Sequence, residues 1–183
     1  MKRLILFTSI LFSVLFLSCK QDSESFIRDA AIYNAYNIQE NQFDATVIDV
    51  SDGDYFTIRF DYDKPNFCAK EEKARLLGVS CPRLNLYTDQ SAEYYAVEAA
   101  AYSSGLVGGK VVVEFDNIAS ARDPNKNIQI YIWTDSGLTL FNKKLLSEGY
   151  GRYDSSRLFN SDRMKSFETA EKSANQAHKG LWN

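Results

Sequence analysis

The sequence predicts a mainly β domain of the α+β class, built on a five-stranded barrel with about three helices. Five short segments are rich in β-branched and aromatic residues and are bounded by turn residues. Three further segments carry apolar residues near helical spacing. Their order is three strands, a helix, two strands and two helices, which is the order expected of an OB-fold barrel with helical additions.

The expected strands occupy residues 45–50, 55–60, 73–79, 111–115 and 128–133. Residues 55–60 and 128–133 alternate apolar and polar side chains, which indicates that one face of each of these two strands is buried. Asp52-Gly53-Asp54 is the turn between the first two strands, and Pro82 ends the third. Several core residues are expected among Val47, Ile58, Leu76, Val112, Ile130 and Tyr131.

Each expected helix has start or stop residues of the usual kinds. Thr88 or Ser91 can cap the first helix, and Gly108-Gly109 stops it. A short second helix covers residues 141–148. Asn160 or Ser161 caps a long third helix, which Gly180 ends.

The first residues read as a targeting segment rather than as part of the fold. Met1-Lys2-Arg3 is followed by an apolar run over 4–17 that is too short to span a bilayer. The run ends in Leu17-Ser18-Cys19, which resembles a relaxed bacterial lipobox with Cys19 as the lipidated first residue. The alternative is an ordinary cleaved signal peptide with a chance cysteine. We therefore expect a lipoprotein signal peptide over 1–18, a tether over 19–43 that could contain a short helix, and one domain over 44–183.

The charge balance argues mildly against strong nucleic-acid binding. The formal net charge is −3, and loss of Lys2 and Arg3 with the leader makes it two units more negative. Nonspecific affinity for nucleic acid comes mostly from neutralised phosphates, so such proteins usually carry a basic field. A local basic groove remains compatible with an acidic chain.

Besides Cys19 the chain has two cysteines, and outside the cytoplasm these two could pair. Cys68 and Cys81 flank Arg75 on what reads as one strand. An extended chain covers about 3.3 Å per residue, which puts the two thiols beyond disulfide reach. A disulfide would need the loop over 67–72 to fold back.

The run ARLLGVSCPR over 74–83, read with Asp52-Gly53-Asp54, resembles the active-site half of the staphylococcal nuclease (thermonuclease) family. That family has a DGDT turn and an RLLGVDTPE-like strand and loop. The resemblance covers roughly residues 45–182 and includes family-like segments at 94–99, 109–116, 145–151 and 177–182. It implies an OB-fold domain of the same kind.

The resemblance implies calcium-dependent hydrolysis of phosphodiesters, with one calcium ion on oxygen ligands. Asp54 matches a calcium aspartate, and Cys81 matches the position whose backbone carbonyl is a ligand. Arg75 matches an arginine that binds phosphate and stabilises the transition state. Asp54 and Arg75 could instead have purely structural roles. The Asp54 side chain could accept hydrogen bonds from backbone N–H groups of its turn, and Arg75 could lie on the barrel exterior and pair with a carboxylate such as Asp54.

Several positions depart from the family pattern. Ser80 replaces the second calcium aspartate, and Arg83 replaces the candidate general base. Asn127 stands at the second arginine, where Arg122 or Lys126 could supply charge only if the loop shifts. The family's base-stacking tyrosine in this turn is replaced by Asn125. The family's pair of tyrosines after the turn over 145–151 matches Ser155 and Arg157, with Tyr153 close by.

These departures leave two functions open. One is a lipid-anchored module outside the cytoplasm, in the bacterial cell envelope, with weak or lost hydrolysis and weak calcium binding. It would bind single-stranded nucleic acid or another ligand through Arg75, Arg83, Lys126 and Arg157. The other is a working calcium-dependent nuclease whose metal site is remodelled. A second carboxylate close to Asp54 in the structure would favour the enzyme. The candidates for that role are Glu71, Glu72, Asp89, Glu93 and Asp123, and the sequence spacing does not distinguish among them.

Overall fold

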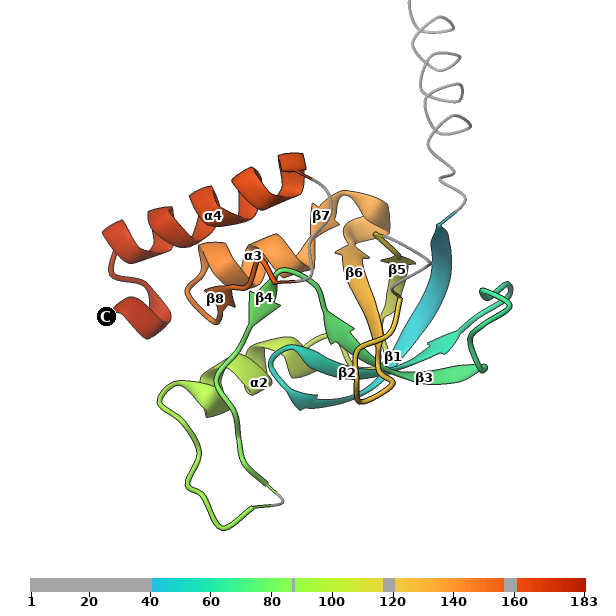
Figure 1. Cartoon of the computed structure of the whole chain (residues 1–183), viewed down its shortest axis with the longest axis horizontal. Helices are drawn as coiled ribbons and strands as arrows, with labels where there is room; N and C mark the ends of the chain where they lie inside the picture. Colours follow the sequence, from blue (N-terminus) through green and yellow to red (C-terminus); the bar gives the residue numbers. More distant parts are fainter. Residues whose placement is uncertain (1–40, 87, 117–120, 157–160) are drawn as a thin grey trace, which may run out of the picture. The chain divides into compact units, whose positions relative to one another are not determined.

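Five strands close into a mixed barrel (Figure 1). The computed structural model describes residues 41–86, 88–116, 121–156 and 161–183. Antiparallel pairs join β2 to β1 and β3, and join β5 to β1 and β6, while a parallel pair between β3 and β6 closes the ring. The predicted OB-fold class is thereby confirmed. The strands are β1 (Gln42–Asp52), β2 (Tyr55–Phe60), β3 (Glu71–Leu76), β5 (Lys110–Glu114) and β6 (Ile128–Thr134).

The strand predicted over 73–79 is two strands, so that prediction was wrong in detail. β3 ends at Leu76, and β4 (Val79–Ser80) begins after a turn in which Gly78 has φ of 75°. That left-handed conformation favours glycine and breaks the ladder. β4 then leaves the barrel and pairs antiparallel with β8 (Arg152–Tyr153). A further short strand, β7 (Thr139–Leu140), extends the sheet beside β6.

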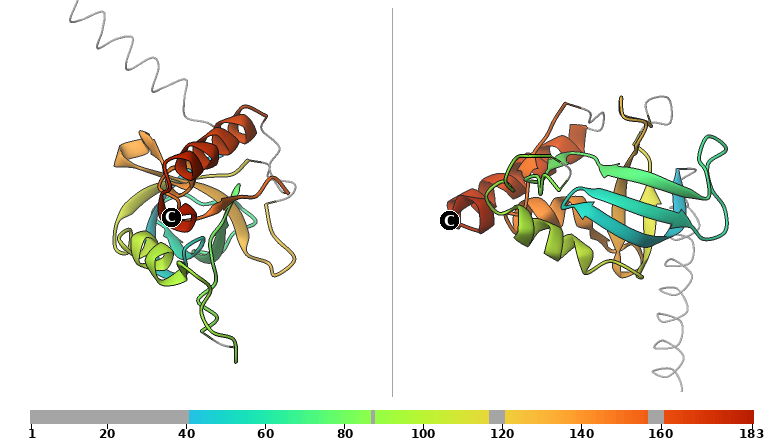
Figure 2. Two further views of the ribbon diagram at one scale, coloured as in Figure 1. Left: turned by 90° about the vertical axis from the view of Figure 1, so that its left-hand side faces the viewer. Right: turned by 90° about the horizontal axis from the view of Figure 1, so that it is seen from below.

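Three helices surround this barrel: α2 (Ala96–Ser104), α3 (Phe141–Ser147) and α4 (Ser161–Gln176). α3 and α4 pack against each other at one end, and α2 contacts β1 (Figure 2). The described residues also form two short 3-10 helices, η2 (Asp135–Gly137) and η3 (Gly180–Trp182). Within the described ranges, no helix has the length and apolarity needed to cross a membrane.

The helix boundaries differ from those expected. α2 begins five residues after Ser91, because Tyr95 at its N-cap holds a left-handed φ of 67°. α4 ends at Gln176, and Gly180 opens η3 instead of ending the long helix. Asn160, an expected cap, lies outside the described residues.

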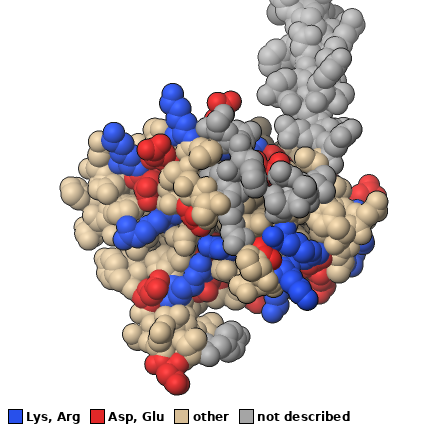
Figure 3. Space-filling model, in the orientation of Figure 1, with Lys and Arg blue, Asp and Glu red and all other residues tan. Residues whose placement is uncertain are grey.

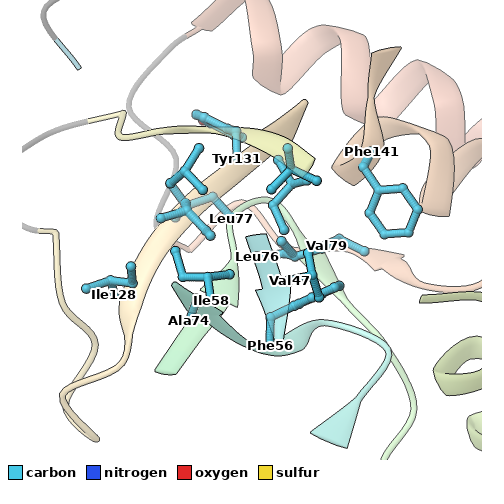
Figure 4. Close-up of a cluster of buried hydrophobic side chains, with 14 of the residues drawn as sticks. Val47, Phe56, Ile58, Ala74, Leu76, Leu77, Val79, Ile128, Tyr131 and Phe141 are labelled. Atoms are coloured by element: carbon cyan, nitrogen blue, oxygen red, sulfur yellow. The ribbon is translucent and has the colours of Figure 1, made fainter. Parts of the chain in front are cut away.

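The main core cluster contains residues of the barrel strands and of α3 and α4 (Figure 4). Five of the six expected core residues are buried: Val47, Ile58, Leu76, Ile130 and Tyr131. Val112 is only half-buried. Successive side chains in a strand point to opposite faces, and Val111 and Val113 occupy the inner face of β5.

Both cysteines in the described residues are free and buried. Burial raises the pKa of the Cys68 thiol to about 11. β1 begins at Gln42, two residues before the expected start of the domain at 44. The expected leader, Cys19 and most of the expected tether lie outside the described residues.

Candidate functional site

Asp54 lies in the turn between β1 and β2, and its side chain is completely buried. Its carbonyl accepts a hydrogen bond of 2.9 Å from the Leu76 backbone N–H, which joins the turn to the end of β3. The neighbouring Gly53 is required by packing, because a Cβ there would lie 2.8 Å from the Cβ and Sγ of Cys81. The turn therefore sits tightly against the segment that follows β4.

Arg83 forms a two-pronged ion pair with this buried carboxylate. Its Nη1 donates to Asp54 Oδ1 at 2.7 Å and its Nη2 donates to Oδ2 at 3.2 Å. Nη1 also lies 3.6 Å from Asp52 Oδ2. Bidentate arginine–carboxylate pairs are among the strongest and most specific hydrogen-bonded contacts in proteins. Arg83, expected at the general-base position, thus binds Asp54, which was expected to be a calcium ligand.

Arg75 reaches the same carboxylate from β3. Its Nε lies 3.5 Å from Asp54 Oδ2 but is buried and makes no hydrogen bond. Its Nη2 lies 3.6 Å from Asp154 Oδ2. The Tyr55 ring faces both guanidinium groups, with its centroid 4.7 Å from Cζ of Arg83 and 5.6 Å from Cζ of Arg75.

These contacts join two arginines and three aspartates into one arrangement. We call it the arginine–aspartate cluster and define it as Asp52, Asp54, Arg75, Arg83 and Asp154. It alternates in charge, and its carboxylates outnumber its guanidiniums by one. Each guanidinium lies beside two carboxylates, which offsets part of the cost of taking these charges out of water. Asp52 also acts on Asp54 as a like charge and contributes to the raised pKa of Asp54.

The pKa values of Asp54 and Arg83 are both raised, which favours the neutral form of the carboxyl and the charged form of the guanidinium. Burial raises the pKa of Asp54, and the guanidiniums of Arg83 and Arg75 oppose this increase. Burial by itself lowers the pKa of Arg83, but attraction to Asp54 outweighs it, so the net shift is upward. Both oxygens of Asp54 accept guanidinium hydrogen bonds, and this geometry is that of an ionised pair.

The loop between β4 and α2 is fastened beside the cluster. The Arg83 backbone N–H donates to Glu93 Oε2 at 2.8 Å, and Glu93 N–H donates back to the Arg83 carbonyl at 2.9 Å. Leu84 N–H donates to Asp52 Oδ1 at 2.9 Å. A pocket of about 300 Å³ opens next to these contacts, and its walls include Asp52, Tyr55, Arg83, Leu84 and Leu86.

Ser80 and Cys81 bring no charge to the site. Ser80 lies in β4, where its backbone pairs with Arg152. Cys81 is buried against Gly53, and its Sγ would lie 3.2 Å from a Cβ placed on Gly151. Burial raises the pKa of the Cys81 thiol well above its ordinary value. The thiol fills space between two glycines and does not act as a nucleophile.

The turn that should carry a second arginine has a structural role instead. Asn127 is buried, and its backbone and side-chain N–H groups donate to the two carboxylate oxygens of Asp123 at 2.9 and 3.0 Å. Lys126 is exposed with φ of 67°. Arg157, expected in the cationic patch, lies outside the described residues.

Arg122 is held away from the cluster by Glu72. Its Nη1 and Nη2 donate to Glu72 Oε2 and Oε1 at 3.1 and 2.7 Å, and it also binds the carbonyls of Phe67 and Lys126. Burial tends to raise the pKa of Glu72, but hydrogen bonds from Arg122 and from the Ala69 N–H outweigh it and lower the pKa. Arg122 therefore ties two loops together and does not replace the missing arginine.

Two members of the cluster were not among the residues expected at the site. Asp52 could have been found, because it belongs to the same Asp-Gly-Asp turn as Asp54. Asp154 had no local sequence signal, because the pairing of β4 with β8 brings it to Arg75. Three of the five carboxylates considered from spacing have partners of their own. The Glu93 carboxylate accepts from the Arg83 backbone N–H, Glu72 binds Arg122, and Asp123 binds Asn127.

The side chains at this site do not fit a calcium ion. Both oxygens of Asp54 accept hydrogen bonds from a cationic group, and that group would have to leave before a metal could bind. Ser80 has lost one anionic ligand, and calcium affinity depends on ligand charge. In the part of the chain that the structure describes, no three His, Cys, Asp or Glu side chains are grouped to hold a metal.

A comparison with protein families matches residues 73–183 to the family described as staphylococcal nuclease homologue. The match covers more than half of the chain. It includes Arg75, Ser80, Cys81 and Arg83, and it begins after the turn that carries Asp54. No curated protein matches the chain.

Proposed function

Because this chain belongs to the family of staphylococcal nuclease homologues, we propose that it is a nuclease-like domain whose phosphodiester hydrolysis is weak or lost. It acts as a binding module for single-stranded nucleic acid. The observation that carries this proposal is the bidentate ion pair between Arg83 and the buried Asp54. It neutralises, from within the chain, the carboxylate that the family uses for its metal.

The missing base is the first reason to expect little hydrolysis. An arginine stays protonated in proteins, so Arg83 cannot take a proton from water. General acid–base catalysis typically contributes about 10²–10⁴ in rate. The second arginine is also absent, because Asn127 is uncharged and Arg122 is bound to Glu72. These losses are not additive, but each removes transition-state stabilisation.

Ligand binding rests on the groups that the site retains. Arg75 and Arg83 offer guanidinium N–H groups, and the Tyr55 ring lies against both. OB-folds bind oligonucleotides on one barrel face. On the face shown in Figure 3, acidic and basic side chains are interspersed. We therefore expect modest affinity that falls as salt increases, because phosphate contacts dominate such binding.

The cellular place of the domain is part of the proposal. The leader and its Leu17-Ser18-Cys19 end support a lipid on Cys19 and a location in the bacterial cell envelope. The domain would then be held at a membrane surface through residues 19–43.

A hydrolysis assay with purified domain, calcium and single-stranded DNA tests the proposal. The wild type should cleave no faster than an Arg75→Gln variant. The double substitution Ser80→Asp with Arg83→Glu should raise calcium-dependent cleavage, because it restores one ligand charge and the base. A matched double variant, Ser173→Asp with Lys172→Glu, makes the same charge change on exposed positions of α4 and should leave cleavage unchanged.

The opposite result would establish the second function. Robust wild-type cleavage that needs both calcium and Arg75 would mean a working nuclease with a remodelled metal site. In that case restoring Ser80→Asp and Arg83→Glu should add little.

A further inference from the structure

Asp154 is the member of the arginine–aspartate cluster that the family resemblance does not explain. It follows β8, and its Oδ2 lies 3.6 Å from Nη2 of Arg75. Its position is well defined, because its backbone N–H donates to the Gly78 carbonyl at 3.2 Å and its Oδ1 accepts from Ser156 N–H at 3.0 Å. One carboxylate oxygen is thus used by the local turn, and the other faces Arg75.

The two arginines of the cluster differ in how firmly they are held. Arg83 makes short bidentate hydrogen bonds to a carboxylate that is fully buried. Arg75 makes only two contacts of 3.5 and 3.6 Å to carboxylates, and its buried Nε has no hydrogen bond. The Arg75–Asp154 contact joins side chains that are 17% and 26% exposed, and ion pairs that solvent reaches are weak. Arg75 is less exposed than Arg83, at 17% against 27%, but its guanidinium makes no short hydrogen bond to a carboxylate, so an incoming anion can compete for it.

We propose that Asp154 determines the anion affinity of this site, because its carboxylate faces Arg75 where a phosphodiester oxygen of the ligand would bind. Carboxylate and phosphate oxygens compete for the same guanidinium N–H groups. The inference rests on the proposed binding function. A phosphate that approaches Arg75 meets the Asp154 carboxylate and a cluster in which carboxylates outnumber guanidiniums. The intact chain accordingly binds single strands weakly, and Asp154 acts as an internal competitor.

The substitution Asp154→Asn isolates this competition. Asparagine keeps the side-chain oxygen that accepts from Ser156 N–H, so the turn is preserved, while the negative charge facing Arg75 is removed. Binding is followed by fluorescence anisotropy of a labelled oligothymidylate at an ionic strength of about 0.15 M, with a calcium chelator present so that cleavage cannot interfere. We expect the Kd to fall about 1.4- to fivefold, from the usual worth of a partly exposed ion pair.

Two controls separate this effect from a general change in charge. Asp63→Asn removes the same charge from the exposed loop between β2 and β3. Residues 71–75 of β3 alone span about 13 Å, which exceeds the Debye length of about 8 Å, so this variant should bind like wild type. Arg75→Gln, introduced into wild type and into Asp154→Asn, should abolish the difference between them. Thermal melts of all variants confirm that each is folded.

A Kd that is equal in wild type and Asp154→Asn would overturn the proposal, and so would a gain that persists without Arg75 or appears equally in Asp63→Asn. Absence of measurable binding by both proteins would also overturn it. Failure of the hydrolysis proposal is detected separately, because only the calcium assay reports cleavage. Cleavage in calcium and the effect of Asp154→Asn on the Kd in chelator are measured independently, so either result can occur with or without the other.

Discussion

Replacing Arg83 with methionine should destabilise the domain strongly, although arginine at a loop position is usually dispensable. Methionine keeps a long apolar side chain and removes the guanidinium. Asp54 would then remain completely buried without its bidentate partner. A buried carboxylate that loses its counter-charge is costly, because water cannot replace the lost contact.

The structure sets the size of the expected effect. Removing one partner of a buried ion pair costs roughly 3–5 kcal/mol. The Arg83 side chain is 27% exposed, and Arg75 Nε stays 3.5 Å from Asp54, so both features reduce the loss. We expect the free energy of unfolding to fall by about 2–4 kcal/mol, which corresponds to a Tm decrease of about 6–15 °C for a domain of this size.

Urea denaturation of wild type, Arg83→Met, Asp54→Asn and the double variant measures this as a cycle. The double variant should be more stable than Arg83→Met, because the unpaired charge is gone, and the coupling should be about 2 kcal/mol or more. Arg59→Met is the control. That arginine is 48% exposed and lies 3.8 Å from its partner, so its loss should cost less than about 1 kcal/mol. Additive effects in the cycle, or equal losses for the two arginines, would refute the reasoning.

Three further outcomes are expected. Gly149→Ala should lower Tm well below that of Gly108→Ala: both glycines have positive φ, but a Cβ on Gly149 would lie 2.2 Å from the Lys179 carbonyl oxygen, whereas a Cβ on Gly108 meets nothing within 4 Å. Equal Tm values for these two variants would contradict the steric argument. The stability difference between wild type and Glu72→Gln should be full above pH 4.5, the ordinary glutamate pKa, and should shrink as pH falls through the lowered pKa of the folded protein. A difference in unfolding free energy that stays constant down to pH 2 would count against it. The mature protein should carry a lipid on Cys19, so intact-mass analysis of membrane extracts should show it, and a Cys19→Ala variant should leave the membrane fraction.

The fold was largely readable from the sequence because it follows from local pattern. Runs of β-branched and aromatic residues between turn residues, two of them alternating, located the five barrel strands to within a few residues, and five of six expected core residues are buried. The errors are at boundaries where backbone conformation matters more than pattern. Gly78 splits the third strand, and the left-handed Tyr95 delays the start of α2.

Only part of the candidate site could be predicted from the sequence. Asp54 and Arg75 were expected together, and they do lie 3.5 Å apart. The substitution at Arg83 was visible as the loss of a base, but its new partner was not, because it lies 29 residues away along the chain. The spacing of carboxylates along the chain did not predict which one would lie beside Arg75. In the structure that carboxylate belongs to Asp154.

What the sequence determined by itself is the barrel and the position of the Asp-Gly-Asp turn, since these depend on residue type and short-range order. It also placed Arg83 and Asn127 where the family resemblance leads us to expect a base and a second arginine. Only the tertiary structure decided that Arg83 neutralises Asp54 and that Asp154 faces Arg75. Closure of the barrel and the pairing of β4 with β8 bring these side chains together from distant parts of the chain. Ion pairs depend on distance in space and on burial, and the chain acquires both only when it folds.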